Sequence, residues 1–96
     1  MKVTTVGFNS DGDGIDALYI DGHLYSYGDY YHNKQADWQR GFIDGLKFAW
    51  PETIKGKLEF EEYTVNGDYE FLNDICDGDV PPQDFANVFP YVDKGR

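Results

Sequence analysis

The chain has 96 residues and a formal net charge of −10, with 18 acidic and 8 basic side chains. Because phosphates repel a protein of this charge, the composition argues against direct binding of DNA, RNA or anionic membranes. The length predicts one domain over residues 1–96, and an aromatic content of 18% predicts a folded aromatic core rather than a disordered chain.

The first part of the chain predicts a three-stranded antiparallel meander. β-forming residues fill positions 2–8 and 15–20, and residues 23–27 supply a third strand. Asn, Asp and Gly at positions 9–14 predict a turn, and Asp21-Gly22 is a strong signal for a type I′ hairpin turn.

Residues 33–49 predict the main helix, with Asn33 as its N-cap and Pro51 as the residue that stops it. The helical period predicts a buried stripe made of Ala36, Gln39, Phe42, Ile43, Leu46 and Ala49 or Trp50. The opposite face carries charges spaced for mutual pairing, which are Asp37, Arg40, Asp44 and Lys47. The small residues Gly41 and Gly45 are expected to let the helix approach the sheet closely.

In the second half, residues 55–65 predict a fourth strand, followed by a second hairpin signal at Asn66-Gly67. Residues 68–72 fit either a fifth strand that pairs back on the fourth or the start of a helix; we expect the strand. Residues 83–89 predict one helical turn. The expected fold is therefore α+β, with an antiparallel sheet of about four to five strands and one main helix packed on it.

The acidic residues are concentrated in this second half. The first 57 residues carry eight acidic and six basic side chains and are almost balanced. Residues 58–93 carry ten acidic side chains and neither lysine nor arginine. Aromatic and aliphatic residues alternate with the acids, which predicts a folded scaffold that holds carboxylates at fixed positions. The alternative interpretation is an ordinary solvated face.

One segment resembles part of a metal site. Asn9, Asp11, Asp13 and Gly14 match the first half of a calcium-binding loop, but Ile20 stands where the loop requires glutamate. We expect a hairpin turn here, with a weak metal site as the alternative.

No set of residues predicts catalysis. His23 and His32 do not form a zinc-like spacing with Cys76, and no serine lies in a hydrolase nucleophile motif. We therefore expect a protein that is not an enzyme and uses no cofactor.

Tyrosines are clustered around the third predicted strand, where five of them lie between positions 19 and 31. Strand alternation predicts that Tyr25 and Tyr27 share one face with His23. Tyrosine is enriched at the centres of protein interfaces, so this face is a candidate contact surface. The alternative is that the rings fill the core of a small sheet.

Cellular location is indicated by what the sequence lacks. No run of 18 apolar residues suggests a membrane span, no apolar leader follows Met1, and Cys76 has no second cysteine to pair with. We expect a cytoplasmic protein, located in the host cytoplasm if a phage encodes it.

In size, pI and its mixture of aromatic and acidic residues, the chain resembles the small nucleic-acid-mimic inhibitors of phages and mobile elements, such as anti-CRISPR and anti-restriction proteins. It also resembles acidic immunity proteins that block nuclease toxins. The resemblance extends over the composition of the whole chain and includes no motif. It implies an inhibitor whose partner is a basic protein that handles nucleic acid.

From the residues themselves, we expect carboxylates of the second half to accept charge-assisted hydrogen bonds from that partner, with two tyrosines as apolar anchors. The expected contact residues are Glu59, Glu61, Glu62, Asp68, Glu70, Asp74, Asp77, Asp79, Tyr25 and Tyr27. The alternatives are an immunity protein or antitoxin against a basic toxin, and a structural or calcium-binding phage module. The sequence does not indicate an oligomeric state.

Overall fold

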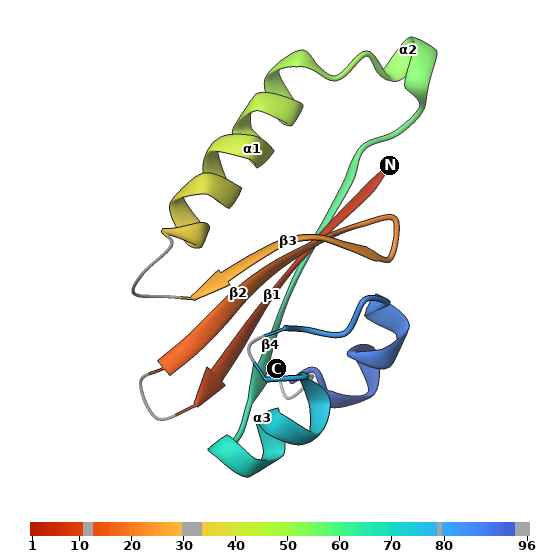
Figure 1. The fold of residues 1–96 in the computed structure, drawn as a ribbon. Coiled ribbons are helices and arrows are strands. Elements are labelled where there is room, and N and C mark those ends of the chain that lie inside the picture. The colour runs from red at the N-terminus through yellow and green to blue at the C-terminus, as the bar shows by residue number, and fades with distance from the viewer. Residues whose placement is uncertain (11–12, 30–33, 79, 94–96) are drawn as a thin grey trace.

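The computed structural model describes residues 1–10, 13–29, 34–78 and 80–93. The fold is α+β, with a four-stranded sheet of strand order β3-β2-β1-β4. The strands are β1 (Lys2–Ser10), β2 (Asp13–Ile20), β3 (His23–Asp29) and β4 (Glu59–Asn66). Helix α1 (Gln35–Ala49) lies on one side of this sheet, and the C-terminal helical segments lie on the other (Figure 1).

The N-terminal meander is confirmed. β2 pairs antiparallel with both β1 and β3, and the β2–β3 turn has positive φ at Asp21 and Gly22, as a type I′ turn requires. The β1–β2 hairpin is longer than the sequence suggested, because Ser10 pairs with Asp13 and the strands continue into the region predicted as a turn.

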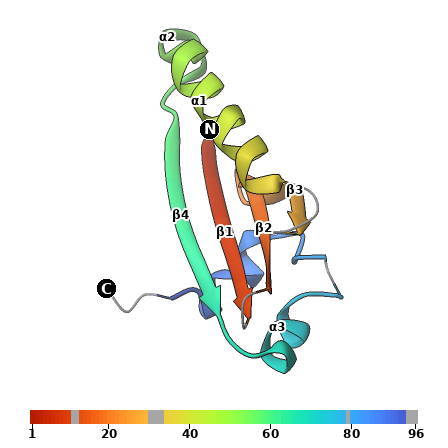
Figure 2. The same ribbon diagram turned by 90° about the vertical axis from the view of Figure 1, so that its left-hand side faces the viewer.

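The prediction of an antiparallel sheet is wrong for β4, which pairs with β1 in parallel, so the sheet is mixed. Parallel neighbours need a long crossover connection. Here the crossover from β3 to β4 contains α1 and the short helix α2 (Glu52–Lys55). Figure 2 shows β4 at the edge of the sheet beside β1.

The predicted fifth strand at residues 68–72 is also wrong, because the chain forms helix α3 (Tyr69–Ile75) there. The Asp68 side chain accepts a hydrogen bond of 2.8 Å from the Phe71 backbone N–H and so caps the helix. Gly67 does not form the predicted I′ turn. The Phe71 ring lies where a Cβ of residue 67 would stand, so any other residue here would force the ring to move.

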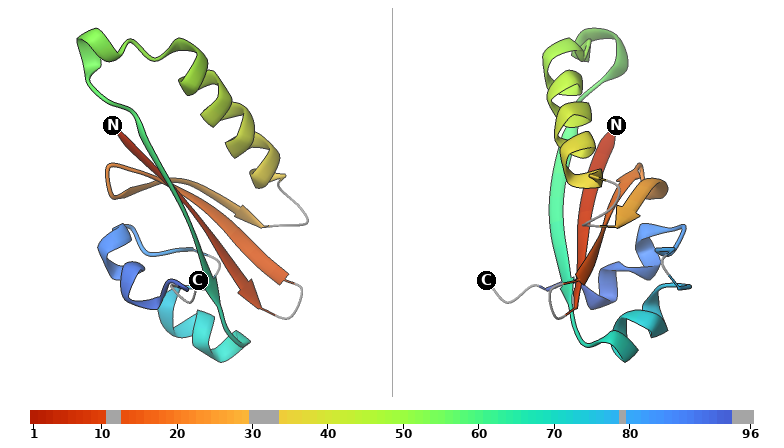
Figure 3. Two further views of the ribbon diagram at one scale, coloured as in Figure 1. Left: turned by 180° about the vertical axis from the view of Figure 1, so that it is seen from behind. Right: turned by 60° about the vertical axis from the view of Figure 1, so that its left-hand side comes forward.

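The hydrophobic core lies between the sheet and the C-terminal segments. Val6, Phe8, Ala17, Tyr19 and Val65 point from the strands into one cluster with Cys76, Val88 and Val92. Two 3-10 turns, Phe85–Asn87 and Phe89–Tyr91, complete the cover in the region predicted as a single helical turn. Figure 3 shows α1 and this C-terminal layer on opposite sides of the sheet.

Helix α1 packs more loosely than its pattern predicted. The buried residues of its inner face are Gln35 and Gln39, whose amides bond to each other at 3.0 Å, whereas Ala36 and Ala49 are exposed. The predicted N-cap Asn33 lies outside the described residues. The helix is 15 residues long, and no helix in the described part of the chain is long and apolar enough to cross a membrane.

Candidate binding surfaces

The acids predicted on β4 point to different faces because the strand alternates. Glu61 is held by two donors, Lys2 Nζ at 2.9 Å and the Tyr63 hydroxyl at 2.7 Å. These two hydrogen bonds lower the pKa of Glu61 below its usual value. Glu59 lies 4.0 Å from Lys57, while Glu62, on the opposite face from Glu61, is exposed. Two of the three β4 acids are therefore partly neutralised within the chain.

The remaining predicted acids lie on α3 and the loop that follows it. Asp68 serves as the helix cap, which gives it a structural role. Glu70, Asp74 and Asp77 are exposed. Asp79 lies outside the described residues, so its predicted contact is not described.

Five of the predicted acids have no basic partner within 4.0 Å among the described residues. One of them, Asp68, is engaged as the cap of α3; the other four are Glu62, Glu70, Asp74 and Asp77. We call these four residues the unpaired acids. They belong to β4, to α3 and to the loop after α3, and these elements follow one another along the chain.

The two predicted tyrosine contacts do not share a face. The β2–β3 register shifts between Leu18 and Tyr19, which makes Tyr25 the extra residue of a bulge. Ser26 then faces α1, because its hydroxyl accepts a 3.0 Å hydrogen bond from Gln35. Tyr27 pairs across from Ala17 on the core side of the sheet. The prediction failed because period-two alternation does not continue through a bulge.

Tyr25 instead belongs to an aromatic cluster on the outside of α1. Its ring stacks on Phe42 at 5.7 Å and on Trp38 at 6.3 Å, and the two helix rings stack at 5.2 Å. Tyr25 remains 59% exposed and Trp38 44% exposed. Phe48, on the same helix, is 93% exposed. We call Tyr25, Trp38, Phe42 and Phe48 the aromatic flank.

Gly41 and Gly45 do not bring α1 close to the sheet. Both are exposed, and no heavy atom outside the local helix lies within 4 Å of where their Cβ atoms would stand. The predicted close approach is therefore wrong. The helical period places these glycines on the solvent side, between Trp38 and Phe48.

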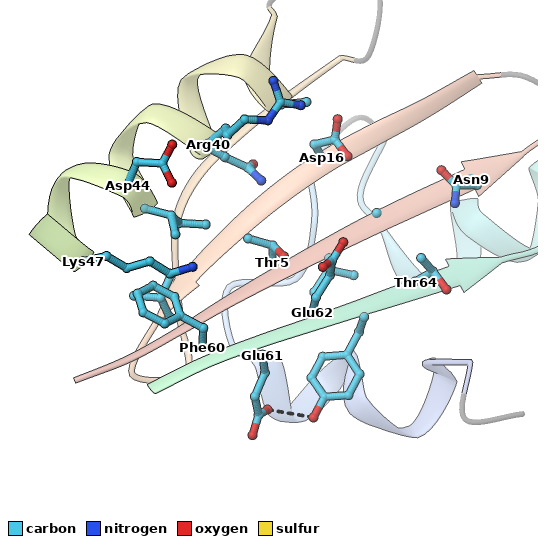
Figure 4. A pocket seen from close by; sticks show the side chains of 17 residues that line it. Thr5, Asn9, Asp16, Arg40, Asp44, Lys47, Phe60, Glu61, Glu62 and Thr64 are labelled. Carbon is cyan, nitrogen blue, oxygen red and sulfur yellow. Dashed lines mark hydrogen bonds between the residues drawn. The ribbon is translucent and has the colours of Figure 1, made fainter. Parts of the chain in front are cut away.

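A groove that the sequence did not predict lies between α1 and β4. It has a volume of about 570 Å³. Its floor is formed by the side of the sheet opposite the core, from Thr5, Gly7, Asn9, Asp16, Glu62 and Thr64 (Figure 4). Arg40 and Lys47 stand on its α1 wall. Partial burial in this groove raises the pKa of Asp16 above its usual value. Asp16 gave no signal in the sequence because its neighbours come from β1 and β4.

The described residues contain no group of three His, Cys, Asp or Glu side chains placed to hold a metal ion. Part of the predicted calcium loop, including Asp11, lies outside the described residues. His23 Nδ1 lies 3.1 Å from Asp84 Oδ1 on the surface, and Cys76 is buried in the core.

No family model, curated protein or solved structure matches this chain.

Proposed function

We propose that this chain is a non-enzymatic inhibitor that binds a basic nucleic-acid-handling protein, such as a nuclease or a CRISPR or restriction effector, in place of its nucleic acid. The observation that carries the proposal is the set of unpaired acids. They stand on a folded scaffold within a segment, residues 58–93, that contains no lysine or arginine. The proposal includes a cytoplasmic location and no affinity of this protein for nucleic acid.

The spacing of these acids supports charge mimicry. Glu70 and Asp74 stand four residues apart on α3, which places their Cβ atoms about 6 Å apart. That spacing is of the same order as the phosphate spacing along a nucleic-acid strand. The unpaired acids are exposed and available for arginine and lysine of a groove built for nucleic acid, and such charges mainly accelerate encounter and set specificity.

The test is capture followed by competition. The immobilised protein is incubated with lysate of a host that carries restriction or CRISPR systems, and bound proteins are eluted with duplex DNA. We expect eluted proteins that bind nucleic acid, and we expect the activity of a purified one to be inhibited by the free protein. Affinity should fall steeply between about 0.05 and about 0.3 M salt, because screening weakens exposed charge pairs.

Variants connect this result to the unpaired acids. A double reversal, Glu70→Lys with Asp74→Lys, should abolish capture and inhibition while leaving the protein folded, since exposed charges contribute little to stability. The matched control, Asp37→Lys with Glu52→Lys, changes the net charge equally on α1 and α2 and should retain both. Equal inhibition by the two double variants would overturn the proposal.

The aromatic flank favours a second candidate, an immunity protein or antitoxin that binds its toxin mainly by apolar contact. Clustered exposed aromatic residues are typical interface anchors. For this candidate, Trp38→Ala would abolish binding, the unpaired acids would be dispensable, and the affinity would depend weakly on salt.

A further inference from the structure

The floor of the groove between α1 and β4 contains a space without a side chain. Gly7 lies on β1, between Asp16 on β2 and Thr64 on β4. A methyl group placed on Gly7 would stand 3.6 Å from Asp16 Oδ1, 3.8 Å from Asn9 Oδ1 and 3.9 Å from Asn9 Nδ2. Two acceptor oxygens therefore lie near one point above a bare stretch of backbone, with the Asn9 amide nitrogen beside them.

Both oxygens are available to a ligand. The Asn9 amide donates through Nδ2 to Asn66 Oδ1 at 3.1 Å, which fixes the orientation of the amide. No donor among the described residues bonds to Asn9 Oδ1 or to the Asp16 carboxylate. A half-buried carboxylate without a partner bears a desolvation cost, which a positively charged donor would remove.

The charge of the floor selects the class of ligand. Asp16 and Glu62 project from the same face of the sheet on strands two positions apart, which separates their backbones by about 10 Å. They repel anions. A calcium ion needs six to eight oxygen ligands, and no group of three metal-binding side chains is present in the described part of the chain. An organic cation fits better than a metal.

Among organic cations, a guanidinium matches two converging acceptors because it offers five N–H donors in a planar fork. The two cations on the α1 wall of the groove contact other groups. Arg40 Nη1 lies 3.2 Å from Asp37 Oδ1, and Lys47 Nζ lies 4.9 Å from the centre of the Phe60 ring. Neither lies within 4.0 Å of a floor carboxylate.

We propose that this groove binds an arginine side chain of the basic partner, with its guanidinium above Gly7 between Asp16 and Asn9. The inference rests on the proposed function, since it assigns one contact of that partner. It adds a residue, Asp16, that lies outside the acid-rich second half of the chain.

The test uses a small probe, so that it does not depend on the partner. N-acetyl-arginine amide is titrated into the isotopically labelled protein and followed by amide chemical shifts. We expect saturable shifts at Gly7, Asn9 and Asp16 with a Kd of about 1–10 mM, the range for one small ligand group. N-acetyl-citrulline amide, which is nearly isosteric but neutral, should bind at least tenfold more weakly.

Two variants address the site directly. Gly7→Ala fills the space with a methyl group in ordinary van der Waals contact and changes no charge, and Asp16→Asn removes the charge while keeping the shape. Each should weaken arginine binding at least fivefold. The matched controls are Gly41→Ala, which meets no neighbour, and Glu52→Gln on α2. Both should bind the probe like the wild type.

Several outcomes would overturn the inference: equal binding of arginine and citrulline probes, full binding by Gly7→Ala and Asp16→Asn, or shifts confined to other surfaces. Saturation of the same residues by micromolar calcium chloride would assign the site to a metal instead. Loss of partner binding in the α3 double reversal, together with no arginine binding in the groove, would reject this inference and leave the proposed function standing.

Discussion

The two faces of the sheet differ in how they are covered. On one face, Phe8, Tyr19 and Val65 are completely buried beneath α3 and the C-terminal 3-10 turns. On the other face, α1 lies over β2 and β3 and leaves the open groove beside β4. Both faces bury apolar side chains, since Val3 and Leu18 on the α1 side are also fully buried, but the α1 side in addition displays Asp16 and Glu62. The closely packed face is expected to supply more of the stability, and the partly open face is available for binding.

The two faces should differ most in the unfolding free energy that is lost when a side chain is truncated to alanine. Phe8→Ala should lose about 3–5 kcal/mol of unfolding free energy, because the buried ring leaves a cavity. Thr5→Ala, on the same strand but facing the groove, should lose less than about 1 kcal/mol. Urea denaturation measures both, and Phe8→Leu serves as the milder replacement if the alanine variant does not fold. Equal losses at the two positions would contradict the comparison.

Removing the hydrogen bond between the core and the C-terminal loop should have a smaller effect on stability. The Tyr19 hydroxyl donates a 2.7 Å hydrogen bond to the Pro82 carbonyl, and burial raises the pKa of this tyrosine strongly. Tyr19→Phe should cost about 1–2 kcal/mol, because the carbonyl loses its donor. The control is Tyr27→Phe, which removes the same hydroxyl group from a tyrosine whose ring is half-exposed. Comparing the thermal unfolding of the two variants isolates the effect of the hydrogen bond. A smaller cost at Tyr19 than at Tyr27 would contradict this account.

Glycine substitutions separate the exposed side of α1 from the packed α3 region. Gly41→Ala should stabilise the protein by about 0.5–1 kcal/mol, since alanine is the better helix former and meets no neighbour. Gly67→Ala should destabilise it instead, because the Phe71 ring occupies the space of a Cβ. The melting temperatures of the two variants measure both the expected gain and the expected loss of stability. Destabilisation by Gly41→Ala would restore the original expectation that this glycine permits close packing.

The smallest expected effect comes from the half-buried carboxylate of the groove. A raised pKa means that the folded protein binds the Asp16 proton more tightly than the unfolded chain does, so this group destabilises the fold as pH rises through the folded-state pKa. Asp16→Asn should therefore raise the melting temperature at pH 7, by about 2 °C at most, because solvent screens the half-exposed carboxylate. The gain should vanish near pH 3, where the wild-type carboxyl is protonated. A lower melting temperature of Asp16→Asn than of the wild type at pH 7 would contradict this expectation, because it would mean that the fold stabilises the charged carboxylate.

The sequence predicted the elements defined by local chemistry. Asp21-Gly22 fixes its hairpin through positive φ angles, and Pro51 follows the end of α1, so neither depends on distant residues. The prediction of strand pairing was wrong for β4, because alternation of apolar and polar residues predicts a strand but not its partner or its direction. Residues 68–72 were misassigned because Asp68 suits a cap as well as a turn, and in the fold its side chain caps α3.

The candidate surfaces were predicted less well, for a related reason. Exposure of Glu70 and Asp74 follows from their charge, but the pairing of Glu61 with Lys2 depends on the register of β4 against β1. The bulge at Tyr25 separated two tyrosines that simple alternation placed together. The groove depends on Asp16, Gly7 and Thr64 meeting across three strands, which no spacing along the chain records.

The central proposal is that the partner binds the elements that carry the unpaired acids, and hydrogen–deuterium exchange of the complex tests it most directly. The complex is formed with the protein eluted by DNA in the capture experiment, and exchange is compared with that of the free chain. We predict slower exchange in β4 and α3, residues 59–75, and little change in the outer turns of α1. Protection confined to residues 38–48 and Tyr25, with none in β4 or α3, would contradict charge mimicry and assign the interface to the aromatic flank.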